Sequence, residues 1–163
     1  DFNSFFSGST YLSKNDKWFR YLRDHVLSLK EYEKINFGLM KVKNFYPETV
    51  LKKIWMNKKQ IKRLHNNGHL IGLHSHTHPT DINSLSTEEQ EKEYTLNKSF
   101  LKNITKNEIK SVSHPCGKYS SETLKILKSL GVLIGFRSNT EIKKMNSLLE
   151  IPRENHSNIL KLL

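Results

Sequence analysis

Twice in this sequence a helical segment ends at a glycine, and an apolar run follows at once. Gly68 is followed by HLIGL and Gly131 by VLIGF, and both runs have the length of a buried strand. Glycine readily takes the left-handed conformation that ends many helices. A helix, a glycine, a buried strand, a polar loop and another helix, in this order, predict a parallel α/β architecture.

Capping residues and apolar spacing predict the other elements. The expected helices begin at Ser13 or Asn15, at Pro47, at Asn57, at Ser86 and at Ser120 or Ser121. The apolar face of the first helix consists of Trp18, Tyr21, Leu22, Val26 and Leu29, and the Pro47 helix is expected to turn Val50, Leu51 and Ile54 inward. Residues 2–6 and IKSVS are predicted as strands, and residues 35–42 as a loop or lid.

Length and composition fit one globular domain. The chain has 163 residues, of which 36% are hydrophobic and 26% charged, and this is too apolar for a disordered chain. No stretch approaches the roughly 18 consecutive apolar residues of a spanning helix. The first residues lack the basic region of a signal peptide. We therefore expect a soluble chain without a membrane span.

The net charge of +11 raises the question of a nucleic-acid partner. The excess is mostly lysine, spread from Lys14 to Lys161, and the chain contains no alanine. This pattern resembles drift toward A/T-rich codons, and no nucleic-acid motif is present, so we expect no nucleic-acid partner. The single cysteine, Cys116, excludes an internal disulfide and slightly favours a reducing compartment such as the cytoplasm.

Three histidines alternate in GLHSHTHP, directly after the first predicted strand. Imidazole is a common zinc ligand, and a catalytic zinc site uses about three protein ligands and an open position for water. His74 and His78 can reach one ion if the chain turns, whereas an extended segment would bring in His76 as well. The alternative is a polar loop whose histidines bond backbone groups. Isolated histidines, namely His25, His65 and His69, are expected to be surface or hydrogen-bonded residues.

The run GHLIGLHSHTHP resembles the histidine motif of the polysaccharide deacetylase (NodB-homology) family. It matches that motif at Gly68, His69, Ile71, Gly72, His74, Ser75, His78 and Pro79. The resemblance implies that His74 and His78 bind a divalent metal ion, zinc above all. His76 then occupies a variable position, and Ser75 and Thr77 hold the loop through hydrogen bonds.

The segment SVSHPCGKYSSETLKILKSLGV resembles the Pro-x-Gly loop of the same family and the helix after it. Pro115, Gly117 and Tyr119 match, as does the serine after Tyr119. The resemblance implies that the backbone N–H of Cys116 binds the tetrahedral oxyanion and that Pro115, Gly117 and Tyr119 line the substrate site. The implied fold is a distorted, incomplete (β/α) barrel of the polysaccharide deacetylase type.

The family's first motif, a pair of aspartates that supplies the general base and a third metal ligand, is absent from this sequence. Residues 2–6 align with the family's second strand, so we expect the first strand upstream and interpret residues 1–163 as a single partial domain. Asp1, Asp16 and Asp81 are weak substitutes, and Asp81 is expected in a turn or cap. Ser113 stands where the family has an arginine that orients the catalytic aspartate.

The function implied is metal-dependent removal of acetyl groups from a sugar or polysaccharide. The end of the chain, LLEIPRENHSNIL, resembles family members associated with bacterial surface carbohydrates. His156 is the candidate general acid, and His114 is expected at the same opening of the site. His156 also fits a surface histidine in a C-terminal tail. Arg153 is interpreted as a substrate-binding residue or as the partner of a glutamate. The alternative function is a non-catalytic carbohydrate-binding relative without the metal-site aspartates.

Overall fold

The computed structural model describes residues 2, 12–140, 145–154 and 159. The chain forms two compact units, Asp1–Trp55 and Met56–Leu163. The expectation of a single domain over the whole chain stays a prediction. None of the described helices has the length and apolarity needed to cross a bilayer.

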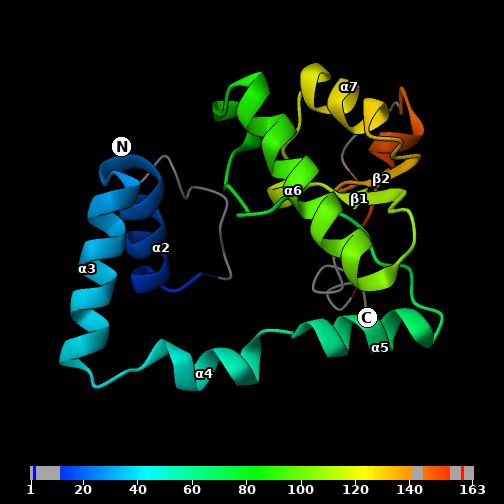
Figure 1. Ribbon diagram of the computed structural model, residues 1–163. Coiled ribbons are helices and arrows are strands. Elements are labelled where there is room, and N and C mark those ends of the chain that lie inside the picture. Colours follow the sequence, from blue (N-terminus) through cyan, green and yellow to red (C-terminus); the bar gives the residue numbers. More distant parts are fainter. Residues whose placement is uncertain (1, 3–11, 141–144, 155–158, 160–163) are drawn as a thin grey trace. The chain divides into compact units, whose positions relative to one another are not determined.

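The first unit is helical in its described part. α2 spans Lys14–Tyr21 and continues into η1, Leu22–Val26, while α3 spans Leu29–Val42 and α4 spans Pro47–Ile54. The capping box of Ser13 at α2 and the proline in the first turn of α4 confirm the predicted helix starts. α2 and α3 lie side by side (Figure 1), and the rings of Phe19 and Tyr32 meet edge to face at 5.7 Å.

Two predictions for α3 and α4 are wrong. Residues 35–42 are the second half of α3 and not a loop or lid, because Ser28 and Glu31 form a capping box that starts a helix through Val42. In α4 the side chains of Leu51 and Ile54 do not turn inward and are 44% and 69% exposed, because no described element covers them.

The strand predicted at residues 2–6 lies mostly outside the described residues. Its one described member, Phe2, is helical and stacks on Trp18 with ring centroids 3.8 Å apart. The strand prediction is therefore wrong at Phe2. The apolar face predicted for the first helix is only partly covered, since Trp18 is 42% exposed.

The second unit begins with α5, Lys58–Asn66, whose start and end are as predicted. Asn57 caps its first turn through a reciprocal bond with Gln60. At its end Gly68 has φ +88°, and its N–H donates to the carbonyl of His65 while the N–H of His69 donates to that of Leu64. These paired bonds satisfy the last carbonyls of the helix, and the left-handed conformation explains why a glycine stands there.

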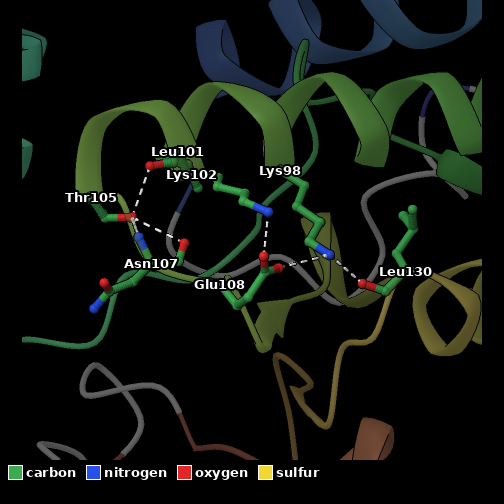
Figure 2. Close-up of polar contacts among 7 residues, drawn as sticks. All are labelled: Lys98, Leu101, Lys102, Thr105, Asn107, Glu108 and Leu130. Atoms are coloured by element: carbon green, nitrogen blue, oxygen red, sulfur yellow. Dashed lines mark hydrogen bonds and ion pairs between the residues drawn. The ribbon is translucent and has the colours of Figure 1, made fainter.

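α6 spans Thr87–Thr105 after the short η2, Ile82–Ser84, and the predicted capping box of Ser86 with Glu89 starts it. Contacts across its carboxyl end fix the turn into the sheet (Figure 2). Glu108 pairs with both Lys98 and Lys102 of α6, and Lys98 also donates to the carbonyl of Leu130. The hydrogen bond from Lys102 holds the pKa of Glu108 below its usual value. These contacts therefore tie α6 to the segments that lead into β1 and β2.

The sheet of the second unit is parallel. β1, Ser111–Ser113, pairs with β2, Ile134–Phe136, and α7, Ser121–Ser129, connects them. Single parallel bridges continue the ladder from Val112 to Leu73 on one side and from Phe136 to Ile151 on the other. Two short turns, η3 (Pro115–Gly117) and η4 (Leu148–Glu150), complete the unit. The parallel α/β architecture is confirmed, while the described residues form no closed barrel.

The strand predicted at HLIGL is wrong for most of its length. Leu73 alone pairs with β1, through bonds from its N–H to Ser111 and from the N–H of Ser113 to its carbonyl, and Leu70 is 93% exposed. A strand needs a neighbour along its length, and the described neighbour, β1, begins only at Ser111. The run therefore approaches the sheet and joins it at its last residue.

The core of the second unit lies between the sheet and its helices. It is a single cluster of buried apolar side chains from Leu73, Ile82, Tyr94, Leu101, Ile109, Val112, Ile126, Leu127, Val132 and Leu149. Side chains of α6 and α7 therefore share this core with Val112 of β1 and with Leu73.

Tyr94 carries a buried hydroxyl without a hydrogen-bond partner in the described part of the chain. Because an unsatisfied buried hydroxyl costs about 1–3 kcal/mol, we expect Tyr94→Phe to raise the free energy of unfolding, by about 1 kcal/mol. Tyr119→Phe is the matched control, since it removes a hydroxyl that donates to Glu150. Urea denaturation of both variants checks this, and a loss of stability in Tyr94→Phe would contradict it.

Candidate functional site

The candidate site lies where parallel strands end. His74 follows Leu73, His114 follows β1 and Arg137 follows β2. Because these neighbours run parallel, their carboxyl ends share one edge of the sheet. The histidine loop, residues 74–79, and the Pro115–Gly117 turn are therefore brought together at this edge.

His74 is oriented by the neighbouring strand. Its Nδ1 lies 2.6 Å from the carbonyl oxygen of Ser113, and its backbone N–H donates to Oδ1 of Asn97 at 3.1 Å. Because a carbonyl oxygen only accepts, Nδ1 carries the proton and Nε2 keeps a free lone pair. The exposed ring is thus prepared to bind an ion through Nε2.

His78 lies beside His74. The two ring centroids are 4.9 Å apart with the ring planes 60° to each other. The loop between them turns sharply, since Ser75 and His78 have φ of +61° and +57°, and the hydroxyl of Ser75 accepts from the N–H of His78 at 3.1 Å. The turn brings both imidazoles to one place, and His76 is exposed between them.

The carboxylate of Glu93, on α6, is bonded to the middle of this loop. It accepts from the N–H groups of His76 and Thr77 and from the hydroxyl of Thr77, each at 2.8 Å. Partial burial tends to raise the pKa of Glu93, but these hydrogen bonds outweigh burial and lower it. The contacts agree with the structural role expected for Ser75 and Thr77. Glu93 itself was not anticipated from the sequence, because nothing distinguishes it from the other glutamates of α6.

In the second loop, Pro115 is buried and Cys116 is exposed with φ +52°. Gly117 has φ +68°, and a Cβ there would lie 2.1 Å from Oγ of Ser138. The left-handed φ and the closeness of Ser138 both disfavour a side chain at this position, so the turn that holds the Cys116 amide favours glycine.

A buried polar group surrounds His114. Its Nε2 lies 2.8 Å from the carbonyl oxygen of Leu149, and its ring lies 4.4 Å from that of Tyr119. Glu150 accepts from the Tyr119 hydroxyl at 3.1 Å, so this predicted substrate-binding hydroxyl already has a partner. Burial first, and then the bond to Glu150, raise the pKa of Tyr119.

Arg137 belongs to the same group and is 6% exposed. Its Nη2 donates to Asn139 at 2.8 Å, while Nε and Nη1 are buried without hydrogen-bond partners in the described part of the chain. Sequence reasoning missed Arg137 and Glu150. The available signal for Arg137 was a charged residue directly after the apolar run VLIGF.

Burial lowers the pKa of His114 below its ordinary value, against opposing effects of the Leu149 carbonyl and Glu150. The unfolded state then binds the proton more readily. The contribution of His114 to the free energy of unfolding is complete above the pKa of the unfolded state, about 6.5, and is lost as the pH falls below it. The loss is about 1.4 kcal/mol for each unit by which the folded pKa lies below the unfolded pKa.

We therefore expect His114→Gln to have a flatter dependence of unfolding free energy on pH between about 6.5 and 5 than the unchanged protein. Urea denaturation over this range is the measurement, with the exposed His69→Gln as control. Equal slopes for His114→Gln and the unchanged protein would contradict the prediction.

The remaining predicted residues make no contact with the histidines that the described part of the chain shows, or lie outside the described residues. Arg153 is exposed, and its N–H lies 3.4 Å from the carbonyl oxygen of Asn139. His156 lies outside the described residues. Asp81 caps η2 through the N–H of Asn83, which confirms its expected role, and Asp16 forms the capping box of α2.

A shallow cavity of about 240 Å³ lies at the opposite, amino-terminal end of the strands. Its lining includes Leu70, Lys110 and Leu133 and none of the predicted site residues. The chemistry-bearing side chains are at the carboxyl edge, where ligands of parallel α/β folds bind, so we place the site there.

The fit to a metal ion is partial. His74 and His78 provide two neighbouring imidazoles of the kind that zinc prefers. Among the residues that the structure describes, no group of three or more histidine, cysteine, aspartate or glutamate side chains is placed to hold an ion. A complete site therefore needs at least one ligand beyond these two.

A parallel sheet that carries paired histidines and a Pro-Cys-Gly turn at its carboxyl edge places the second unit in the α/β class. The sequence profile of polysaccharide deacetylases matches residues 40–135, which include both loops and more than half of the chain. The chain therefore belongs to the polysaccharide deacetylase family. No curated protein sequence matches it significantly.

Two solved structures, PplD and IcaB, have a similar fold. The Streptococcus pyogenes deacetylase PplD, in complex with acetate, is 20% identical over 92% of this chain and 77% of its own, with a TM-score of 0.57. IcaB from Ammonifex degensii is 16% identical over 65% of this chain, with a TM-score of 0.54. A family 4 carbohydrate esterase (CE4) pseudoenzyme from Bacillus anthracis is 22% identical over 50% of this chain, with a TM-score of 0.45.

The chain spans 51% of the length of IcaB and 28% of that of the Bacillus anthracis protein. At these sequence identities the likeness to PplD and IcaB concerns the fold.

Proposed function

We propose that this protein is a metal-dependent deacetylase that hydrolyses acetyl groups of a sugar or polysaccharide. The observation that carries the proposal is the geometry of His74 and His78. The Ser113 carbonyl fixes the proton of His74 on Nδ1, so Nε2 is free beside the His78 ring, 4.9 Å away between centroids. Family membership and the acetate bound to PplD support the choice of reaction.

His74 and His78 would hold a divalent ion, zinc above all, together with an aspartate from a strand upstream. When bound, such an ion polarises the acetyl carbonyl and lowers the pKa of a coordinated water. A second upstream aspartate would accept the proton of the attacking water. The complete domain would then be a distorted (β/α) barrel in which residues 1–163 lack the first strand.

The second loop would bind the substrate. The Cys116 N–H would donate to the developing oxyanion, and Pro115, Gly117 and Tyr119 would line the sugar site. A histidine, His156 by resemblance, would protonate the leaving amine or alcohol, and Arg153 would bind a polar group of the sugar. The products are acetate and a deacetylated sugar, and a role in bacterial surface-carbohydrate metabolism fits the resemblance of the chain end.

A non-catalytic carbohydrate-binding protein is the second candidate. Two observations favour it: the described residues provide two metal-binding side chains without a third, and Ser113 stands at the position of the family's arginine. Without a third ligand and a base, the two loops at the carboxyl edge would still bind a sugar but would not hydrolyse it.

The test is acetate release by the full-length protein. It is treated with a chelator, reloaded with zinc, and incubated with N-acetylglucosamine oligomers and O-acetylated sugars. Acetate that forms only after zinc is restored supports the deacetylase. Binding of these sugars by calorimetry, without acetate at any metal concentration, would favour the carbohydrate-binding alternative.

A further inference from the structure

The histidine loop has a backbone conformation that is unfavourable by itself. Ser75 and His78 both have positive φ, a region that non-glycine residues rarely occupy. Such conformations cost about 1–3 kcal/mol each and persist only where surrounding contacts determine them. The loop therefore needs contacts from outside to keep His74 and His78 together.

Those contacts come from α6. Glu93 accepts three hydrogen bonds from the two residues midway between the histidines, and Asn97 accepts the N–H of His74. Glu93 and Asn97 are four residues apart, so they lie on one face of the helix. One helix face thus holds both the beginning and the middle of the loop.

α6 is itself well fixed. Its neighbour on the same face, Gln90, is buried and accepts the hydroxyl of Thr123 on α7 at 2.6 Å, and its amide donates to the carbonyl of Leu85. Tyr94 is fully buried in the core. Gln90 and Tyr94 fix α6 against α7 and the core. The position of Glu93 is therefore set by the packing of its helix and not by the histidine loop.

We propose that Glu93, assisted by Asn97, is the positioning residue that sets the distance between His74 and His78 and so the affinity for the metal ion. The inference rests on the proposed function. Glu93 acts here through the loop and not as a ligand, since both of its oxygens accept hydrogen bonds from the loop and it forms no metal-binding group with the described histidines. Without it, the loop relaxes toward ordinary φ values and the two imidazoles separate.

The experiment compares three variants of the full-length protein. Glu93→Ala removes all three acceptors. Glu93→Gln keeps one oxygen for the two N–H groups, and its amide can donate to the Thr77 hydroxyl. Glu91→Ala is the matched control, because Glu91 is exposed and lies two residues away, near the opposite side of α6.

Two readouts are measured, namely affinity for Co²⁺ from its visible spectrum and hydrogen exchange of the His76 and Thr77 amides. We expect Glu93→Ala to lose about 10–100-fold in affinity, as for other residues that orient metal ligands. Both amides should exchange faster in this variant. Glu93→Gln should keep most of the affinity and of the protection, and Glu91→Ala all of it.

The possible failures differ. If the unchanged protein binds Co²⁺ and Glu93→Ala binds it equally well, the positioning role is overturned while the proposed function stands. If the unchanged protein binds no Co²⁺, the proposed metal site fails and this inference fails with it. If Glu93→Gln weakens binding as much as Glu93→Ala, the charge and not the positioning is responsible, which also overturns the inference.

Discussion

Replacing His74 and His78 together by alanine is expected to remove the bound zinc from the full-length protein. The two imidazoles lie with ring centroids 4.9 Å apart and are the proposed metal-binding pair among the described residues. A single remaining ligand would not retain the ion. Because a metal ion contributes several kcal/mol of transition-state stabilisation, acetate release should fall by about 1,000-fold or more.

The matched control is His76→Ala. His76 lies between the two histidines, and its contact with Glu93 is made by its backbone N–H, which alanine keeps. Elemental analysis should find about one zinc per chain in the unchanged protein and in His76→Ala, and background zinc in the double variant. Retention of zinc by the double variant, or its loss from His76→Ala, would sink the assignment of the ligands.

Helix starts could be predicted because caps are local. Ser13, Asn57 and Ser86 each bond a backbone N–H three residues ahead, and the sequence shows both partners. The same signal is present at Ser28, where Glu31 completes the capping box, although residues 35–42 were predicted as a loop or lid. The extent of the strands was harder to predict. HLIGL is apolar enough for a buried strand, but its pairing depends on where β1, distant in the sequence, begins.

The residues of the candidate site also fall into those with a local sequence signal and those without one. His74 and His78 could be named from the sequence, because the motif that contains them is continuous and resembles the histidine motif of the family. Glu93 contacts the loop across 16 and 17 residues of sequence, from a helix rich in glutamate. Arg137 is buried beside His114 only because β1 and β2 pair in register. Contacts that depend on tertiary packing leave no local pattern to find.

Gly135→Ala is expected to cost the second unit about 3 kcal/mol or more, near the upper end for overpacking. Gly135 lies in the middle of β2, and a Cβ there would be 2.3 Å from the carbonyl oxygen of Leu149 and 2.9 Å from its Cα. These atoms are backbone and cannot rotate away. The bond from the Ile151 N–H to the carbonyl of Gly135, at 2.8 Å, holds the same segment in place.

The matched control is Gly72→Ala, at the other edge of the sheet. A Cβ at Gly72 would meet Oγ of Ser111 at 2.7 Å, a hydroxyl that can rotate, and the Ser111 carbonyl oxygen at 3.2 Å, so a smaller cost of about 1 kcal/mol is expected. Urea denaturation of both variants measures the difference. The Leu149 carbonyl also bonds Nε2 of His114, so Gly135→Ala should disturb the pH dependence that His114 provides. If the two glycine variants were equally stable, the segment around Leu149 would be free to move, and His114 would not be held by it.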